Sequence, residues 1–317
     1  MISAVTLNPC IDMTLILDKL IVGDHNVVAR HRSDVSGKGI NVNVVLNNLG
    51  IETKAVGFEF TQSGTPIGDF LNSIHVPFES VSLDARLRTN TKVFDESTEA
   101  MTEINCKGPQ LSEECVPALM AVFERSLNDT DILVVDGSVP PGIPADIYRR
   151  MIECARARGI RTVLDATGPL LEEGLKACPD VIKPNRLELE ILLDRKIETM
   201  DEALEACRQL VAQGIGAVCL TLGEKGAVLV SKDGAWYSES MKIPVKSLQG
   251  AGDSLVAGLC KAMAEGASWE DMLRSGVTAS LGSLLREGTL LCTREDYDRL
   301  YPQVPVRKLD EKHHIMI

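Results

Sequence analysis

Two glycine-rich segments each stand directly before a stretch with helical character. Gly250-Ala251-Gly252-Asp253 precedes the apolar run Leu255–Met263, and Ser36-Gly37-Lys38-Gly39-Ile40-Asn41 opens a second such stretch. Glycines let the backbone turn tightly and present consecutive N–H groups at a helix N-terminus, where an anion can bind. Asp253 places a carboxylate beside one such site, and Lys38 and Asn41 add polar contacts at the other. For either segment alone, a helix cap or a hinge remains the alternative interpretation.

Two further segments carry polar groups at strand ends. Lys183-Pro184-Asn185-Arg186-Leu187-Glu188 follows a short predicted strand, and ligands of α/β proteins gather at the carboxyl ends of strands. Asn185 and Glu188 are three positions apart at the start of a helix and could hold Mg²⁺ through water, which is the usual mode for this ion. An asparagine cap after a proline-terminated strand is the alternative. Thr221-Leu222-Gly223-Glu224-Lys225-Gly226 links two strands and by itself is compatible with a simple hairpin turn.

Composition narrows the class of protein. The 317 residues include 33 Lys and Arg against 45 Asp and Glu, a net charge of −12 that disfavours a nucleic-acid partner. The nine cysteines are an odd number without a C-x-x-C pair, which predicts buried thiols in a reducing compartment and no zinc site or disulfide framework. No segment approaches the ~18 apolar residues of a membrane span, and the first residues lack the pattern of a signal peptide. We therefore expect a cytoplasmic protein without a membrane partner.

Short β-rich runs alternate with helical stretches along most of the chain. The strands expected are Ile2–Asn8, Thr53–Phe58, Asp131–Ser138, Thr162–Ala166, Asp180–Lys183 and Ala217–Thr221. The helices expected are Ile40–Leu49, one capped by Ser112 that runs to about Leu127, Pro144–Arg158, Asp253–Glu265, Ser268–Leu285 and, capped by Thr293, Arg294–Tyr301. This alternation predicts an α/β fold in which helices cover both faces of a mostly parallel sheet.

Two regions depart from that alternation. Thr14–Val35 and Thr89–Ile104 each contain two short alternating segments with no helix between them. They predict a small antiparallel β lid over one end of the α/β core, with an apolar outer face through which two copies would form a homodimer. We expect a single domain over residues 1–317, with lid segments at 12–36 and 87–107.

Taken in chain order, the four polar segments resemble the motifs of the ribokinase-like (PfkB) carbohydrate kinases. That family carries G-K-G-x-N near the start, K-P-N-x-x-E in mid-chain, then T-x-G-x-x-G and G-A-G-D, and the match covers essentially the whole chain. Thr6–Asp12, Ser138–Gly142 and Lys183–Glu190 are similar to the branch that contains 1-phosphofructokinases and tagatose-6-phosphate kinases. Arg86–Gly108 resembles the 1-phosphofructokinases most.

The resemblance implies a ribokinase-like three-layer sandwich and a Mg²⁺-dependent kinase that uses ATP. Its implied reaction converts fructose 1-phosphate into fructose 1,6-bisphosphate, with tagatose 6-phosphate as the alternative acceptor. A non-catalytic sugar-phosphate-binding regulator on the same fold is an alternative from another class, which the intact Asp253, Asn185 and Glu188 disfavour. A hydride-transfer enzyme has less support, because the chain lacks a complete G-x-G-x-x-G.

The resemblance also implies roles for single residues. Asp253 would be the catalytic base, and the amides of Gly250, Ala251 and Gly252 would form an anion hole for the transferred phosphoryl group. The residues expected to contact the sugar phosphate are Asp12, Gly37, Lys38, Gly39, Asn41, Arg88, Asn90 and Ser138. Those expected to serve the nucleotide are Lys183, Asn185, Glu188, Thr221, Gly223 and Gly226, of which Asn185 and Glu188 would also reach Mg²⁺ through water.

Two cations are candidates for binding the substrate phosphate, and a few residues differ from the motifs usual in the family. Because an acidic chain must concentrate positive groups locally to attract an anionic sugar phosphate, we expect Lys38 and Arg88 to bind the phosphate already on the substrate. Asp136 stands where the family usually has Ser, two residues before Ser138. Ser36, Phe58-Glu59-Phe60 and Gln249 also depart from the usual pattern, and none of these changes removes a catalytic group.

Overall fold

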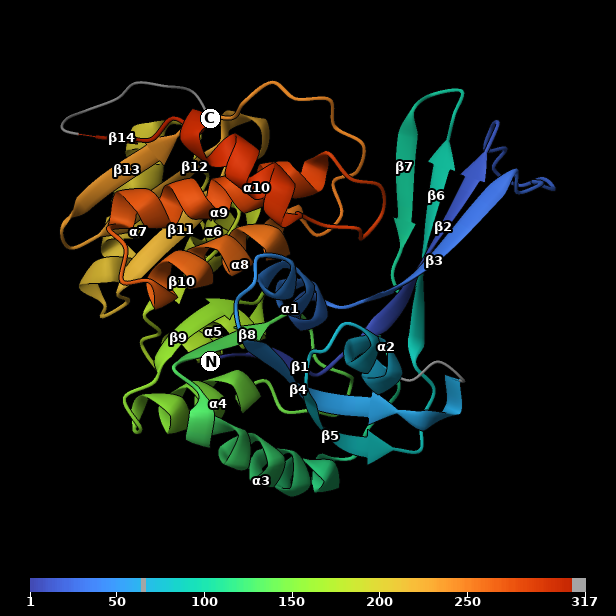
Figure 1. Cartoon of the computed structure of the whole chain (residues 1–317), viewed down its shortest axis with the longest axis horizontal. Helices are drawn as coiled ribbons and strands as arrows, with labels where there is room; N and C mark the ends of the chain where they lie inside the picture. The colour runs from blue at the N-terminus through green and yellow to red at the C-terminus, as the bar shows by residue number, and fades with distance from the viewer. Residues whose placement is uncertain (64–66, 310–317) are drawn as a thin grey trace.

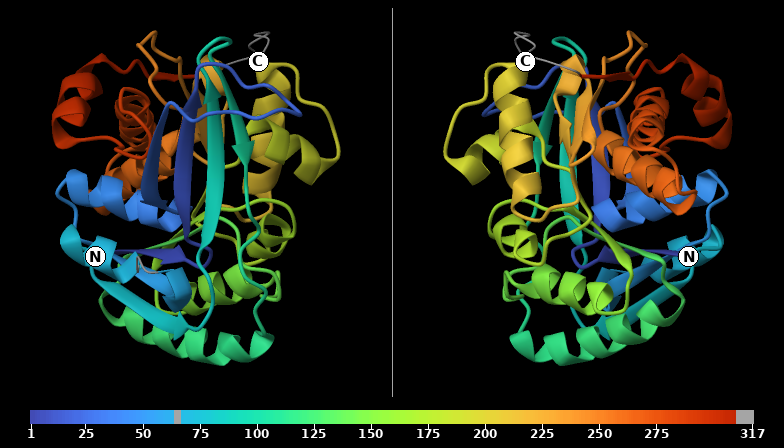
Figure 2. Two further views of the ribbon diagram at one scale, coloured as in Figure 1. Left: turned by 90° about the vertical axis from the view of Figure 1, so that its right-hand side faces the viewer. Right: turned by 90° about the vertical axis from the view of Figure 1, so that its left-hand side faces the viewer.

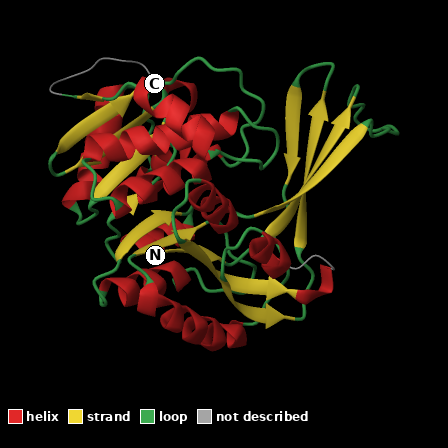
Figure 3. Ribbon diagram, in the orientation of Figure 1, coloured by secondary structure: helices red, strands yellow, loops and turns green. Residues whose placement is uncertain are grey.

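The computed structural model describes residues 1–63 and 67–309, which form a large and a small β-sheet with helices around the large one (Figure 1). The large sheet has ten strands, and Figure 3 shows how its strands run between the helices. In sheet order these are β14 (Arg307–Lys308), β13 (Gly234–Ser238), β12 (Ala227–Ser231), β11 (Ala217–Thr221), β10 (Val181–Ile182), β9 (Arg161–Asp165), β8 (Ile132–Asp136), β1 (Ile2–Thr6), β4 (Thr53–Phe60) and β5 (Phe78–Leu83).

The strands at the centre of the large sheet are apolar along their length. Every residue of β1 and of β8 is buried, as expected for parallel strands that helices cover on both faces. Neighbouring strands from β5 to β11 pair in parallel, whereas β12, β13 and β14 add an antiparallel edge. The predicted α/β class is therefore confirmed.

Alternating side chains of these strands belong to two hydrophobic cores, one on each face. Ile132 and Val134 pack into one core, and their neighbours Leu133 and Val135 pack into the other. The first core contains residues of α1 (Lys38–Asn48), α8 (Ala251–Ala264), α9 (Trp269–Leu284) and α10 (Arg294–Leu300). The second contains residues of α2 (Ile67–Ser73), α3 (Val116–Ser126), α4 (Ile147–Arg156), α5 (Pro169–Leu175), α6 (Arg186–Leu193) and α7 (Met200–Ala212). Figure 2 shows these helix groups on either side of the molecule.

The small sheet projects from one side of the large one (Figures 1 and 2). Its four strands, in sheet order, are β3 (Arg30–Ser36), β2 (Cys10–Leu17), β6 (Arg88–Asp95) and β7 (Ala100–Ile104). The outer pairs are antiparallel hairpins, as the sequence predicts, but the central pair of β2 and β6 is parallel. The predicted antiparallel direction is therefore wrong for this one pair, because alternation of polar and apolar residues indicates a strand but not its direction.

The remaining differences from the predicted elements lie at their ends and at the sheet edges. The predicted helices and strands are present, with ends that differ by a few residues. The strands β5, β13 and β14 and the short helix α2 were not predicted. Of these, β5 is only half-buried and β14 spans two exposed residues, so neither has the apolar run of a central strand. Within residues 1–63 and 67–309, no helix is both long and apolar enough to cross a membrane.

Candidate functional site

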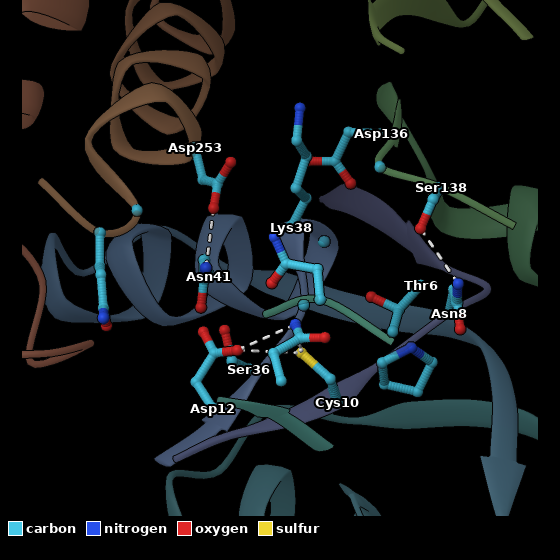
Figure 4. Close-up of a pocket in the computed structure, with 18 of the residues that line it drawn as sticks. Thr6, Asn8, Cys10, Asp12, Ser36, Lys38, Asn41, Asp136, Ser138 and Asp253 are labelled. Carbon is cyan, nitrogen blue, oxygen red and sulfur yellow. Dashed lines mark hydrogen bonds between the residues drawn. The ribbon is translucent and has the colours of Figure 1, made fainter. Parts of the chain in front are cut away.

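A cavity of about 470 Å³ lies where the carboxyl ends of β1, β8 and β9 meet the base of the small sheet. Figure 4 shows Asp253, Lys38 and Asp136 gathered on one side of it and Asp12 and Cys10 on the other. The cavity brings together most residues predicted to serve the sugar and the reaction, namely Asp12, Gly37, Lys38, Gly39, Asn41, Arg88, Asn90, Ser138, Gly250 and Asp253. The motifs that are distant in sequence thus converge.

The first turn of α1 packs very closely on β1. A Cβ atom at Gly39 would lie 2.2 Å from the carbonyl oxygen of Val5, so only glycine allows this approach. Lys38 begins the helix and Asn41 lies in its first turn, and both line the cavity. The glycine-rich segment therefore acts by bringing the start of α1 to the carboxyl end of β1.

Asp253 occupies the first turn of α8, which begins after Gly250 in a left-handed conformation with φ of 67°. The carboxylate is 7% exposed and accepts a hydrogen bond of 2.7 Å from Nδ2 of Asn41. Burial raises the pKa of Asp253, while Lys38 and the Asn41 amide oppose that rise. Ala251 and Gly252 follow Gly250 in the helix, and neither is among the described residues that line the cavity.

A buried carboxylate next to the cavity pairs with two lysines. Asp165, which ends β9 and is 1% exposed, has its two oxygens 3.1 Å from Lys38 Nζ and 3.2 Å from Lys183 Nζ. Burial alone would raise the pKa of Asp165, but the two ammonium groups outweigh burial and hold it below its usual value. Asp253 and Asp136 lie close enough to reinforce the positive charge on Lys38, whose pKa is raised. Lys38 is thus already paired within the protein.

A second buried ion pair forms the base of the small sheet. Oδ2 of Asp12 lies 3.1 Å from Lys92 Nζ, and Oδ1 accepts hydrogen bonds from Asn90 Nδ2 at 3.1 Å and from the Cys10 thiol at 3.4 Å. Burial favours the neutral acid, but Lys92, Ser36 and Asn90 together hold the pKa of Asp12 below its usual value. The pKa of the Cys10 thiol rises to about 12 through burial, so the thiol remains a donor.

Arg88 lines the cavity but directs much of its guanidinium to main-chain oxygens. Nε and Nη2 donate to the carbonyl of Asn8 at 3.1 and 2.8 Å, and Nη1 donates to the carbonyl of Cys106 at 2.8 Å. Nearby, Nδ2 of Asn8 donates to Ser138 Oγ at 3.0 Å. Arg88 therefore fixes the segment between β1 and β2, a task that the sequence did not indicate.

A separate cavity of about 360 Å³ is lined in part by Asn185, Thr221 and Gly223, which are half of the residues predicted to serve the nucleotide. Asn185 also forms a reciprocal cap with Glu188: Glu188 N donates to Asn185 Oδ1 at 2.9 Å, and Asn185 N donates to Glu188 Oε2 at 2.8 Å. The helix-cap interpretation is thus present in the structure. Gly226 is not among the described lining residues and instead packs against β13.

The sequence analysis missed three residues that line the first cavity, Thr6, Asn8 and Lys92, and it also missed Asp165, which lies next to the cavity. Asp165 offered one usable signal, because it ends a buried strand beside another strand that also ends in an aspartate, Asp136. Carboxyl ends of adjacent parallel strands meet at one edge, so the two carboxylates were bound to be neighbours. Lys92 offered no comparable signal.

Comparison with known proteins gives a consistent result. Residues 4–296 match the model of a protein family that is described as "pfkB family carbohydrate kinase". A 1-phosphofructokinase of Bacillus subtilis (strain 168) is 32% identical over 311 residues, which are 98% of this chain and 100% of that protein. The structure of a possible 1-phosphofructokinase of Thermotoga maritima has a TM-score of 0.89 at 25% identity, with 98% of this chain and 100% of that chain covered. Phosphofructokinase-2 of Escherichia coli, in complex with potassium, has a TM-score of 0.87 at 28% identity, with 95% and 98% covered.

The Asp12–Lys92 pair should stabilise the protein in a pH-dependent way. Both side chains are more than nine-tenths buried, so a double-mutant cycle with Asp12→Asn and Lys92→Met should give a coupling of about 1–3 kcal/mol near neutral pH. Because the folded-state pKa of Asp12 is lowered, this coupling should be full above the unfolded-state pKa of ~3.9 and decline as pH falls through the folded-state value. Urea unfolding of the four proteins measures it, and a coupling that persists unchanged in acid would contradict the assignment.

Proposed function

Because this chain belongs to the pfkB family of carbohydrate kinases, and is thus an ATP-dependent phosphotransferase, we propose that its acceptor is fructose 1-phosphate and its product fructose 1,6-bisphosphate. Full-length similarity to the Bacillus subtilis 1-phosphofructokinase supports this choice of sugar. The two sugar phosphates differ by one phosphoryl group on the C6 oxygen. The reaction therefore needs a group that accepts the C6 hydroxyl proton and donors that stabilise the transferred phosphoryl group.

The placement of Asp253 is the observation that carries the proposal. Its carboxylate is buried in the first turn of α8, lines the cavity and faces Asn41 on α1. The first N–H groups of a helix have no partner within that helix. At the start of α8, Ala251 N donates to the Leu248 carbonyl at 3.5 Å, which leaves the N–H groups of Gly252 and Asp253 for an anion. One helix terminus thus offers both a base for the acceptor hydroxyl and donors for a phosphoryl group.

The chemistry suits a buried carboxylate of this kind. Asp253 must be ionised to take a proton, and Lys38 and Asn41 favour its ionised form although burial disfavours it. Phosphoryl transfer passes through a loose transition state, so a base of modest strength is sufficient. Fixed dipoles and charges around the phosphoryl group then supply most of the stabilisation.

The sugar phosphate would occupy the side of the cavity next to the small sheet. Asp12, Asn41 and Ser138 place polar groups there that can contact sugar hydroxyls. A guanidinium has five N–H donors, and the main-chain contacts of Arg88 leave it with one N–H on Nη1 and one on Nη2 for a phosphate. Asn90 contacts Asp12 through its amide nitrogen and Cys106 N through its oxygen, so we assign it to positioning Asp12.

The nucleotide would occupy the second cavity, beside Thr221 and Gly223, with its phosphates directed toward Lys183 and the start of α8. The position of Lys183 supports this placement of the phosphates. Its Nζ lies 3.6 Å from the point that a Cβ atom at Gly252 would occupy, and therefore close to the start of α8.

Within the described part of the chain, no group of three or more His, Cys, Asp or Glu side chains could hold a metal. Glu188 Oε1 lies outside the helix cap, and Asn185 Oδ1 accepts one hydrogen bond within it. Both oxygens can therefore accept hydrogen bonds from water on a Mg²⁺ ion that ATP carries. When bound there, Mg²⁺ would neutralise charge on the phosphates.

Activity measurements on wild type and Asp253→Asn test the proposal. Wild type should have its highest kcat/KM with fructose 1-phosphate among fructose 1-phosphate, fructose 6-phosphate, tagatose 6-phosphate and fructose. Asp253→Asn should lower kcat by about 10²–10⁴-fold, because it removes a positioned base. The exposed Asp298→Asn on α10 is the matched control and should leave kcat unchanged. A clear preference for tagatose 6-phosphate would refute the substrate, and near-normal turnover in Asp253→Asn would refute the base.

Asn41 should set the acid limb of the pH–rate profile. Activity should fall as pH drops through the pKa of Asp253, and Asn41→Ala removes a donor that favours the carboxylate. The acid limb of kcat/KM should then move upward by about one pH unit, since a hydrogen bond to a charged group contributes about 1.5–3 kcal/mol and one pKa unit equals about 1.4 kcal/mol. Asn47→Ala on the same helix, which loses a bond to the Ile74 carbonyl instead, should keep the wild-type limb. An unmoved limb in Asn41→Ala would show that another group controls it.

We also propose that two copies of the chain associate through the outer face of the small sheet. Side chains alternate along a strand, and Asp12 and Glu103 line the cavity, so Met13, Leu15 and Ile104 lie on the opposite face. Ile104 is 57% exposed there. Sedimentation velocity should show a dimer for wild type and a monomer for Ile104→Lys, whereas Ile191→Lys, on the exposed side of α6, should remain a dimer. A wild-type monomer at all concentrations would contradict the interface.

A further inference from the structure

One buried carboxyl group at the cavity has no task in the reaction described so far. Asp136 is the last residue of β8, is 2% exposed and lines the cavity together with Lys38 and Asp253 (Figure 4). Neither of its side-chain oxygens has a hydrogen-bond partner in residues 1–63 and 67–309. A buried polar group without a partner costs roughly 1–3 kcal/mol, so an orphaned carboxyl in a cavity indicates that a ligand supplies the partner.

The backbone holds Asp136 firmly in this position. Asp136 pairs in register with Asp165 on β9, and Gly137 N donates to the Asp165 carbonyl at 2.9 Å. The hydroxyl of Tyr148 donates to the main-chain oxygen of Asp136 at 2.8 Å. With its backbone fixed on both sides, the residue presents its side chain to the cavity at a defined place.

The neighbouring charges determine which form of Asp136 is present. Asp165 is paired with two ammonium groups and Asp253 accepts the Asn41 amide, whereas Asp136 has neither kind of partner. Three carboxylates and two ammonium groups sum to 2 − 3 = −1, and a single proton on Asp136 makes this group of side chains neutral. The titratable groups that face Asp136 are Lys38, Tyr148, Asp165, Lys183, Asp253 and Cys260. Burial raises the pKa of Asp136 well above its usual value, and the negative charges of Asp253 and Asp165 raise it further. The positive charges of Lys38 and Lys183 oppose this rise without cancelling it.

A protonated carboxyl group can do what a carboxylate cannot. It donates a hydrogen bond, and the ligand atoms that must pass between Lys38 and Asp253 in a kinase are anionic phosphoryl oxygens. An ionised Asp136 would repel those oxygens.

We propose that Asp136 binds the transferred phosphoryl group by donating a hydrogen bond from its carboxylic acid to a phosphoryl oxygen, an assignment that rests on the proposed kinase function. The contact exists in the product, fructose 1,6-bisphosphate, and not in fructose 1-phosphate, which lacks the transferred group. Affinity for the bisphosphate must then depend on the Asp136 proton, and affinity for the monophosphate must not.

Calorimetric titration of wild type with the two sugar phosphates, at several pH values between about 6 and 9, tests the proposal. Above the pKa of Asp136, the Kd for fructose 1,6-bisphosphate divided by that for fructose 1-phosphate should rise about tenfold per pH unit, because one proton is linked to binding. Asp136→Asn keeps an N–H donor without an ionisable proton and should remove this slope, and Asp136→Ser should remove it as well. Phosphate groups of the ligand titrate near pH 6, but that contribution is common to the three proteins and cancels when they are compared.

The outcomes separate this inference from the function on which it rests. A ratio that does not change with pH in wild type, or a slope that survives in both variants, overturns the role of Asp136. Equal slopes for the two ligands also overturn it, because the contact would then be to the sugar or to the phosphate already present. If wild type phosphorylates no sugar phosphate but shows the slope, the kinase function fails while the contact is supported. If wild type is active without the slope, the inference alone fails.

Discussion

The architecture of the cavity depends on one carboxylate that two lysines share. Asp165 sits at the end of β9, and its partners come from the start of α1 and from the segment after β10. Removing an ion from water costs several kcal/mol unless close opposite charges compensate, so the buried Asp165 and Lys183 stabilise each other, and the partly exposed Lys38 adds a second cation. Their pairing therefore joins α1 to the large sheet at the carboxyl ends of its central strands. It also sets a positive potential beside Asp253, which keeps a buried carboxylate usable as a base.

The cations of the cavity share a second property, since each already has a partner in the protein. Lys38 pairs with Asp165, Lys92 pairs with Asp12, and Arg88 contacts main-chain carbonyls. An incoming sugar phosphate thus meets a set of charges whose directions are fixed beforehand, and little reorganisation is needed when it binds. This preorganisation explains how a chain with net charge −12 can offer a site to an anion without a patch of unpaired positive groups.

The sequence predicted the elements of the site better than the partners of its side chains. Glycines before α1 and α8 indicated both helix starts, and buried aliphatic runs indicated the central strands, because backbone freedom and burial are local properties. Asp165 was passed over because its two lysines lie in other elements, and no spacing rule connects them. Arg88 was correctly placed at the cavity, but its bonds to carbonyl oxygens depend on the path of the segment before β2. For Asn185 and Glu188 the sequence left a helix cap and a metal contact open, and the structure contains the cap.

The parallel pairing of β2 with β6 has a consequence for the order of folding. Each outer hairpin of the small sheet, β2–β3 and β6–β7, joins residues that are near in sequence and can close early. The central pair joins Cys10–Leu17 to Arg88–Asp95, and the chain between them includes β3, α1, β4, α2 and β5. Because closing a long segment costs entropy that non-local contacts repay only later, the two hairpins meet after β1, β4 and α1 have assembled. The sheet that covers the sugar side of the cavity thus depends on segments that are far apart in the chain, as does the large sheet, in which β1 pairs with β8.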